Sequence, residues 1–202
     1  MQPLVSLYLL DTLLGFDMSG IINATNLEVA NIKDSTGTNT AMTVNSNGTM
    51  TPSKMCYSAF GLTGLRDATS SNAVITTWTL LNSAPYTTLG SAITHSSGVF
   101  TLPHTGKFLI SLQYGGYGDG GNRNYVGGSI QYSSDSGANF TIQTRALQNT
   151  HADGAYFTAN CQVLFEITNT TTQKVRFNDY VTSNTKVVNY GNQTMCIFQQ
   201  VG

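Results

Sequence analysis

Few residues of this sequence have side chains suited to acid–base or metal chemistry: the chain has three histidines and two glutamates. His151 and Asp153 could form a catalytic or metal-binding pair, but Asp153-Gly154 ahead of an alternating run is typical of an ordinary turn. Asp119 lies among glycines and has oxygen donors suited to calcium, yet no second carboxylate follows at the spacing of a calcium loop. The sequence therefore predicts no catalytic residue, no metal and no cofactor.

Carboxylate and cysteine chemistry have no better support. Glycosidases act through a pair of carboxylates, and no two carboxylates here stand in a plausible context for such a pair. The three cysteines, Cys56, Cys161 and Cys196, are far apart and form no C-x-x-C pair that would indicate zinc or redox chemistry. Cys161 and Cys196 fall inside apolar alternating runs, so we expect them to be small buried hydrophobic residues. The sequence predicts a protein that is not an enzyme.

The composition favours an uncharged, all-β surface or scaffold protein. Only 9% of the residues are charged, whereas Thr (29), Ser (18) and Asn (18) supply most of the polar residues. A net charge of −1 with four arginines argues against nucleic acid as a partner. Scarce Glu, Lys and Arg argue against a helical bundle. An apolar content of 40% argues against intrinsic disorder.

From Cys56 onward, apolar and polar residues alternate in short runs with a turn roughly every 8–12 residues, which is typical of a β-sandwich or jelly roll. The longest run places Phe157, Phe165 and Ile167 on one face and Tyr156 on the other. Residues 115–128 hold seven glycines and are predicted to form a long surface loop. The predicted strands are residues 58–62, 74–80, 99–102, 108–114, 130–132, 140–144, 157–167, 175–181, 186–190 and 194–201.

Residues 1–55 are predicted to form an extended arm, and residues 56–202 a separate domain. Asp11 interrupts the apolar start after ten residues, whereas a membrane-spanning helix needs about 20, so no membrane insertion is expected. No Lys or Arg precedes Lys33, which argues against a signal peptide; translation from Met18 is an open alternative. Asn47-Gly48 predicts a hairpin turn. The apolar residues expected to attach the arm to a partner are Leu4, Leu7, Leu9, Leu10, Leu13, Leu14, Ile21 and Ile22.

Residues 93–117, ITHSSGVFTLPHTGKFLISLQYGGY, carry a recognisable pattern of Gly98, Phe100, Pro103, Gly106 and Phe108. This pattern resembles the strand–turn–strand signature of the complement-type globular head in the tumour-necrosis-factor-like (TNF-like) jelly-roll superfamily. The run AYFTANCQVLFEITNTTTQKVRF and the closing TMCIFQQVG are similar to later strands of that family. The resemblance implies an antiparallel jelly-roll sandwich that assembles as a homotrimer. Outward-alternating Tyr156 and Tyr180, with Tyr190, are the expected trimer-interface residues.

The segment LEVANIKDSTGTNTAMTVNSNGTM resembles N-terminal portions of structural proteins from marine tailed phages. Together the two resemblances imply a non-enzymatic virion protein on the exterior of a phage particle. Such a protein would be a trimeric head decoration or head-fibre knob, anchored by its arm to the major capsid protein or other virion proteins.

Two other functions stay open. A receptor-binding tail-fibre tip would recognise host surface glycans through the glycine-rich run, with Tyr117, Asp119, Arg123 and Tyr125 as the receptor residues. A secreted ligand of the same superfamily is the third reading. Head or tail location, copy number and host are not predicted by the sequence.

Overall fold

The computed structural model describes residues 31–33, 40–44, 46–47, 50–52, 55–68, 70–118, 123–182, 185–187 and 193–201. Within these ranges every regular element is a β-strand, and all strand pairs are antiparallel. The predicted all-β, antiparallel class is therefore confirmed. No helix in the described ranges is long and apolar enough to cross a membrane.

The larger sheet, called the β10 sheet, has eight strands in the order β5–β15–β10–β16–β4–β6, with β13 also on β10 and β7 on β4. Because β10 is the longest strand, it pairs with β13 along one edge and with β16 and then β15 along the other. The bounds are β4 Cys56–Leu62, β5 Arg66–Ala68, β6 Trp78–Leu81, β7 Leu89–Gly90, β10 Gly106–Gly118, β13 Tyr156–Ile167, β15 Thr185–Val187 and β16 Met195–Gln200.

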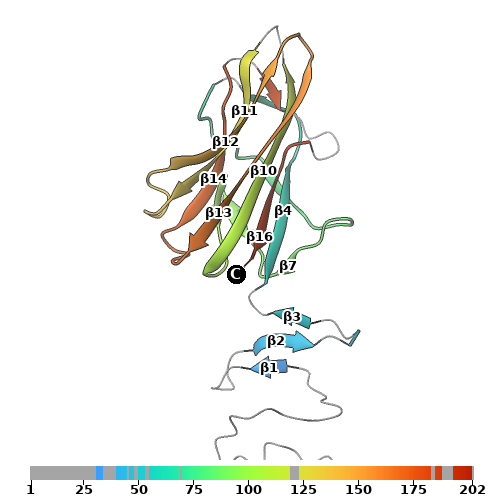
Figure 1. Ribbon diagram of the computed structural model, residues 1–202, viewed down its shortest axis with the longest axis vertical. Coiled ribbons are helices and arrows are strands. Elements are labelled where there is room, and N and C mark those ends of the chain that lie inside the picture. Colours follow the sequence, from blue (N-terminus) through green and yellow to red (C-terminus); the bar gives the residue numbers. More distant parts are fainter. Residues whose placement is uncertain are drawn as a thin grey trace, which may run out of the picture.

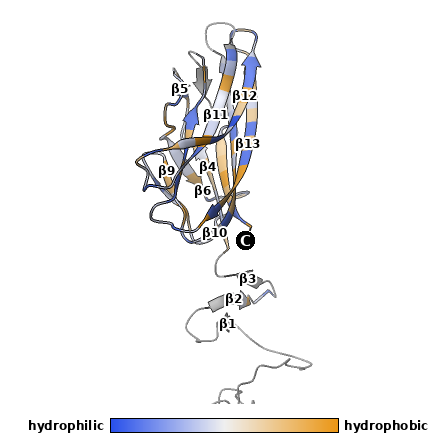
Figure 2. Ribbon diagram, turned by 60° about the vertical axis from the view of Figure 1, so that its left-hand side comes forward, coloured by the Kyte–Doolittle hydropathy of each residue, from blue (hydrophilic) through white to orange (hydrophobic). Residues whose placement is uncertain are grey.

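The second sheet, called the β11 sheet, has five strands in the order β12–β11–β14–β9–β8. It packs against the β10 sheet to form a sandwich (Figure 1). Hydrophobic and hydrophilic residues alternate along the long strands (Figure 2), as expected where one face is buried. The bounds are β8 Thr94–Ser96, β9 Val99–Thr101, β11 Arg123–Ser133, β12 Thr141–Thr150 and β14 Lys174–Asp179.

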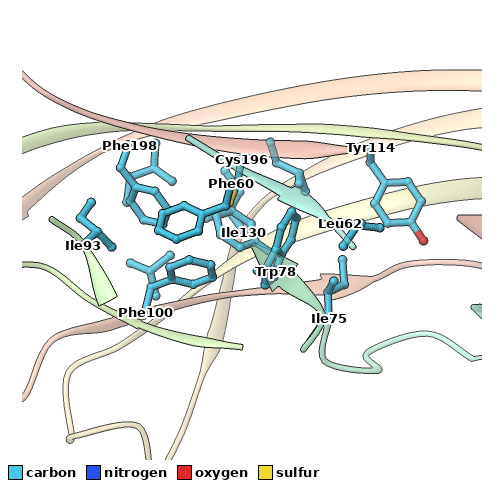
Figure 3. Close-up of a cluster of buried hydrophobic side chains, with 14 of the residues drawn as sticks. Phe60, Leu62, Ile75, Trp78, Ile93, Phe100, Tyr114, Ile130, Cys196 and Phe198 are labelled. Atoms are coloured by element: carbon cyan, nitrogen blue, oxygen red, sulfur yellow. The ribbon is translucent and has the colours of Figure 1, made fainter. Parts of the chain in front are cut away.

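Aromatic side chains from both sheets fill the space between them (Figure 3). Phe100 and Phe177 of the β11 sheet meet Phe60, Trp78 and Phe198 of the β10 sheet, with ring centroids 5.0–6.2 Å apart. Most of these contacts are edge-on, an arrangement that adds about 0.5–1.5 kcal/mol per pair beyond the burial of area. The core is thus built from the inward residues that the alternation predicts.

A buried polar network ties the two sheets together at one end of the core. The carboxylate of Asp179, on β14, has no exposed surface and accepts hydrogen bonds from both terminal nitrogens of Arg66, on β5. The hydroxyl of Tyr114, on β10, donates to the same carboxylate at 2.8 Å. Burial is the main cause that raises the pKa of Tyr114 well above its usual value, and the Asp179 carboxylate adds to it. Three distant strands are held by one charged pair in a low-dielectric interior.

The prediction of a single strand over residues 74–80 is wrong. Val74 bridges to Asn178, and the amide of Ile75 donates to the carbonyl of Phe177, so this part of the chain lies on the β11 sheet. The strand proper begins at Trp78 and pairs with β4 in the β10 sheet. The chain crosses between the sheets here, and for that reason Ile75 is buried in place of its neighbours Val74 and Thr76.

The prediction of a long glycine-rich loop over residues 115–128 is also wrong, because β10 extends to Gly118 and β11 begins at Arg123. The glycines serve close packing. A Cβ on Gly115 would lie 2.7 Å from the carbonyl oxygen of Gln193, and a Cβ on Gly128 would lie 2.6 Å from the Tyr114 ring. A glycine-rich run can form strands here because Gln193 and Tyr114 of the same chain occupy the space that a side chain would need.

Residues 31–52 contain a separate three-stranded sheet, β1 Asn31–Lys33, β2 Thr40–Val44 and β3 Met50–Pro52. Val44 pairs with Met50, which confirms the predicted hairpin. Figure 1 places this small sheet beyond the end of the sandwich at which β4 begins and the C-terminus lies; this end is called the proximal end. The eight apolar residues assigned to attachment, from Leu4 to Ile22, lie outside the described residues.

Candidate functional site

The outward face of the β10 sheet carries three consecutive cross-strand rows without a charged residue. Residues directly opposite each other in antiparallel strands point to the same side, so the pairing of the strands gives the rows directly. From β13 through β10 and β16 to β4 and β6, the rows are Leu164, Leu109, Gln199 and Tyr57; Gln162, Ser111, Ile197, Ala59 and Leu81; and Asn160, Gln113, Met195, Gly61 and Thr79. These rows are called the uncharged face.

The centre of the uncharged face is apolar and slightly hollow. Leu109, Met195 and Ile197 are half-buried, and Leu164 at the β13 edge is 56% exposed. A shallow hollow of about 360 Å³ lies between β13, β10 and β16. Its lining is Ser111, Leu112, Gln113, Asn160, Cys161, Gln162, Met195 and Ile197. Such a surface suits a protein partner, because apolar centres with polar amide rims are typical of interfaces.

Charge appears on this side of the sheet only where the rows end. Lys107 pairs in register with Glu166 at the proximal end, one step beyond the Leu109 row. At the opposite, distal end Tyr117 and Tyr156 are cross-strand partners whose ring centroids lie 5.5 Å apart. The distal row continues in register from Tyr117 to Lys186 and Asp67. Charged residues therefore stand at both ends of the three uncharged rows.

The outward face of the β11 sheet has the opposite character. The guanidinium of Arg176 donates to Gln131 at 2.8 Å and lies 4.0 Å from the ring centre of Phe140. The ammonium of Lys174 donates to the Thr101 hydroxyl at 3.0 Å and to the Thr170 carbonyl at 2.9 Å. Partial desolvation lowers the pKa of Arg176. These cations are therefore engaged within the same subunit.

The predicted interface tyrosines lie on different sheets. Tyr156 is 64% exposed and extends the β10 side beyond the uncharged face. Tyr180 is half-buried on the β11 side, 5.2 Å from Tyr125, with Arg145 lying 4.2 Å over its ring. Tyr190 lies outside the described residues. The role of these tyrosines in a trimer stays a prediction.

The structure does not gather the predicted receptor residues into one loop. Tyr117 belongs to β10, whereas Arg123 and Tyr125 belong to β11 and stand on the other sheet. Asp119 lies outside the described residues. The Tyr117 ring contacts that of Tyr156, and the Tyr125 ring contacts that of Tyr180, both in tilted arrangements, so the structure forms two tyrosine pairs in place of the expected loop.

The remaining titratable residues form no cluster. Within the described ranges no three His, Cys, Asp or Glu side chains are placed to hold a metal ion, and His151 and Asp153 are exposed. The three cysteines are free thiols. Cys196 is completely buried, as predicted, but the prediction that Cys161 is buried is wrong, because it is half-buried and lines the hollow. Burial raises the pKa of Cys56 and of Cys161 to about 11; hydrogen bonds with Ser58 and Thr144, respectively, partly oppose this.

Sequence reasoning missed the apolar residues of the uncharged face, although a signal was present. In the runs FLISLQY and MCIFQQ, apolar residues stand at both parities: Leu109 lies between Phe108 and Ile110, and Ile197 lies between Cys196 and Phe198. A strand with one wet face normally alternates cleanly. The apolar residues at the outward parity were therefore an available sign of a second buried face.

Solved structures with similar folds include a TNF protein and a TNF-family ligand. Eiger TNF from S. frugiperda superposes with a TM-score of 0.57 at 10% identity, covering 73% of this chain and 93% of that chain. Murine APRIL superposes with a TM-score of 0.53 at 10% identity, covering 73% of this chain and all of that one. No protein-family model matches this sequence, and no curated protein matches it. The likeness to these structures, with the two-sheet topology, shows that the chain has a TNF-like jelly-roll fold.

Proposed function

We propose that this chain is a non-enzymatic structural protein that assembles as a homotrimer through the uncharged face. The observation that carries the proposal is the row of Leu164 and Leu109, beside Ile197 and Met195, on the outer side of a sheet whose inner side already forms the core. Leaving that apolar surface in water is unfavourable by roughly 25 cal/mol per Å². The uncharged face itself has no charge that a covering subunit would desolvate.

A threefold ring needs a head-to-tail contact between two different patches. The second patch is supported by the exposed apolar side chains of the β12 and β13 edge. Leu147 on β12 is 46% exposed. Its cross-strand partner on β11 is Gly127, and the carbonyl of Gly127 accepts a hydrogen bond from the amide of Tyr180. This edge would contact the uncharged face of the next subunit. The complement-type resemblance of residues 93–117 implies the same stoichiometry.

Light scattering on the full chain tests the trimer. We expect a mass of about 65 kDa, three times the 21.6 kDa of one chain. Ile197→Asp would place three unpaired carboxylates in the interfaces, at a cost of several kcal/mol each, and should give monomers that retain the β-rich circular dichroism spectrum. Thr94→Asp, at an exposed position of β8 on the edge of the β11 sheet opposite β12, is the control and should leave the mass unchanged. A wild-type mass equal to one chain would overturn the proposal.

We further propose that the trimer is a complement-type knob on the exterior of a phage virion, anchored by the N-terminal arm. The phage-like run between residues 20 and 51 and the low charge of the chain support this role. The arm enters at the proximal end, which leaves the distal end free to point outward (Figure 1). Deletion of residues 1–55 should give a trimer that no longer binds particles lacking this protein. Normal occupancy by the truncated form would place attachment in the jelly roll.

A receptor-binding fibre tip is a second candidate, favoured by the Tyr117–Tyr156 pair. The pair lies at the distal end, and the Tyr156 ring is largely exposed, so its face is accessible for stacking on a sugar ring. Binding of host surface glycans to the full chain, measured on an immobilised glycan panel, tests this role. Tyr156→Ala should abolish such binding, whereas Tyr86→Ala, in the loop between β6 and β7, should not. Equal binding by both variants would remove the assignment.

A further inference from the structure

The outward face of the β11 sheet carries positive charge that no carboxylate of the sheet offsets. β8, β9, β11 and β12 contain no Asp or Glu. β14 contains one, Asp179, whose carboxylate is fully buried and ion-paired in the core. Asp135, in the turn after β11, is held by hydrogen bonds within that turn and forms no ion pair with a described cation. Lys174, Arg176 and Arg145 of the outward face are called the basic stripe.

The pairing of the strands places these three cations on successive rows. Lys174 and Arg176 are two residues apart on β14, so they point to the same side. Arg145, on β12, is the partner of Ser129, and Ser129 is also the partner of Asn178, two residues beyond Arg176. Rows two residues apart are separated by about 7 Å, so the basic stripe covers about 14 Å along the sheet.

Neutral groups hold the basic stripe in place. The acceptors of Lys174 and Arg176 are a hydroxyl, a backbone carbonyl and an amide oxygen, all of them uncharged. The guanidinium of Arg176 lies over the Phe140 ring, and that of Arg145 lies over the Tyr180 ring. Stacking on a ring orients a guanidinium without cancelling its charge. The side chains therefore lose less freedom when an anion binds.

Arg145 has donor groups that the described part of the chain does not use. Its side chain is exposed, whereas those of Lys174 and Arg176 are half-buried. Its guanidinium contacts the Tyr180 ring and donates no hydrogen bond to a described residue. A guanidinium presents its N–H groups as a planar fork, which fits a carboxylate through a pair of parallel hydrogen bonds. This end of the basic stripe is therefore ready to receive a carboxylate.

We propose that the basic stripe binds a linear polysaccharide that carries carboxylate groups. A chain with repeated carboxylates can engage several cations of the stripe at once. β12 also exposes Thr141 and Gln143, whose neutral groups can form hydrogen bonds with sugar hydroxyls. A single-stranded nucleic acid fits less well, because its bases need free aromatic faces, and guanidiniums already cover one face of Phe140 and of Tyr180. The uncharged face lies on the other sheet, so a trimer would present three stripes.

Binding of a polygalacturonate oligomer to the full chain, measured by calorimetry, tests the basic stripe. We expect binding that weakens as the salt concentration is raised, because salt screens exposed charges. Arg145→Gln should weaken binding about tenfold, since a charge-assisted contact with the carboxylate is lost. Lys107→Gln removes an exposed cation from the β10 sheet, so it is the matched control and should bind as the wild type does.

The other outcomes overturn the proposal in different ways. No binding of polygalacturonate, or an equal loss in Arg145→Gln and Lys107→Gln, removes the basic stripe as a binding site. Tighter binding of poly-aspartate than of polygalacturonate would assign an acidic protein partner in place of the polysaccharide. A loss in Tyr156→Ala with no loss in Arg145→Gln would place the ligand at the distal tyrosine pair.

Light scattering on each variant separates the basic stripe from the proposed trimer. Weaker binding by an Arg145→Gln variant that keeps the wild-type mass supports the stripe, whatever that mass is. Lys174→Gln, on the same stripe, repeats the test if Arg145→Gln changes the mass, and unchanged binding by Lys174→Gln then overturns the proposal.

Discussion

The outward faces of the two sheets are made of the same kind of alternating strand, yet they differ in charge. The β11 sheet carries Lys174 and Arg176, and each is engaged by acceptors or a ring of its own subunit. The β10 sheet keeps charge away from three consecutive rows and places Leu109, Met195 and Ile197 there. A face whose polar groups are hydrogen-bonded within the subunit can remain exposed to water, whereas an uncharged apolar face is typical of contact with a partner.

The largest expected effect comes from breaking the Arg66–Asp179 ion pair, which links the β10 sheet to the β11 sheet. Arg66→Met leaves the fully buried Asp179 carboxylate without its cation and should lower the free energy of unfolding by about 3–5 kcal/mol. Denaturant unfolding followed by Trp78 fluorescence measures this loss. The double variant Arg66→Met with Asp179→Leu should recover part of it, because no charge is then left unpaired. A loss below about 1 kcal/mol for the single variant would contradict the role of the network.

A smaller effect is expected from matched truncations on the two outward faces. Arg176→Ala removes the hydrogen bond to Gln131 and the contact with Phe140, and should lower the free energy of unfolding by about 1–2 kcal/mol without changing the mass in solution. Leu109→Ala should instead shift the mass toward the monomer at low protein concentration. If Arg176→Ala dissociates the assembly and Leu109→Ala does not, the assignment of the two faces is reversed.

The smallest effect concerns the turn that joins β11 to β12. Hydrogen bonds from Ser133, first, and from Asn139 lower the pKa of Asp135 from 3.8 to about 2. A folded pKa below the unfolded value stabilises the fold above about pH 4, and this contribution is lost as the pH falls to about 2. The difference in melting temperature between wild type and Asp135→Asn should therefore shrink over that range. A pH-independent difference would contradict the charged turn.

The sequence predicted the inward residues far better than the outward surface. Phe108, Ile110 and Leu112 follow strict alternation, and each is buried as expected. The glycine run after Gly115 was misread because glycine marks both loops and close strand contacts, and only the position of Gln193 and Tyr114 distinguishes them. The uncharged face escaped prediction because its rows join residues from five strands.

The sequence by itself determined the all-β class, the inward face of each strand and the small number of side chains suited to catalysis. These properties depend on residue type and on a period of two, which act locally. Only the tertiary structure decided that β10 lies between β13 and β16, and hence that Leu109, Leu164 and Ile197 belong to one continuous surface. The physical reason is that backbone hydrogen bonds between strands are alike for every sequence, so the choice of partner depends on side-chain packing across the whole sandwich.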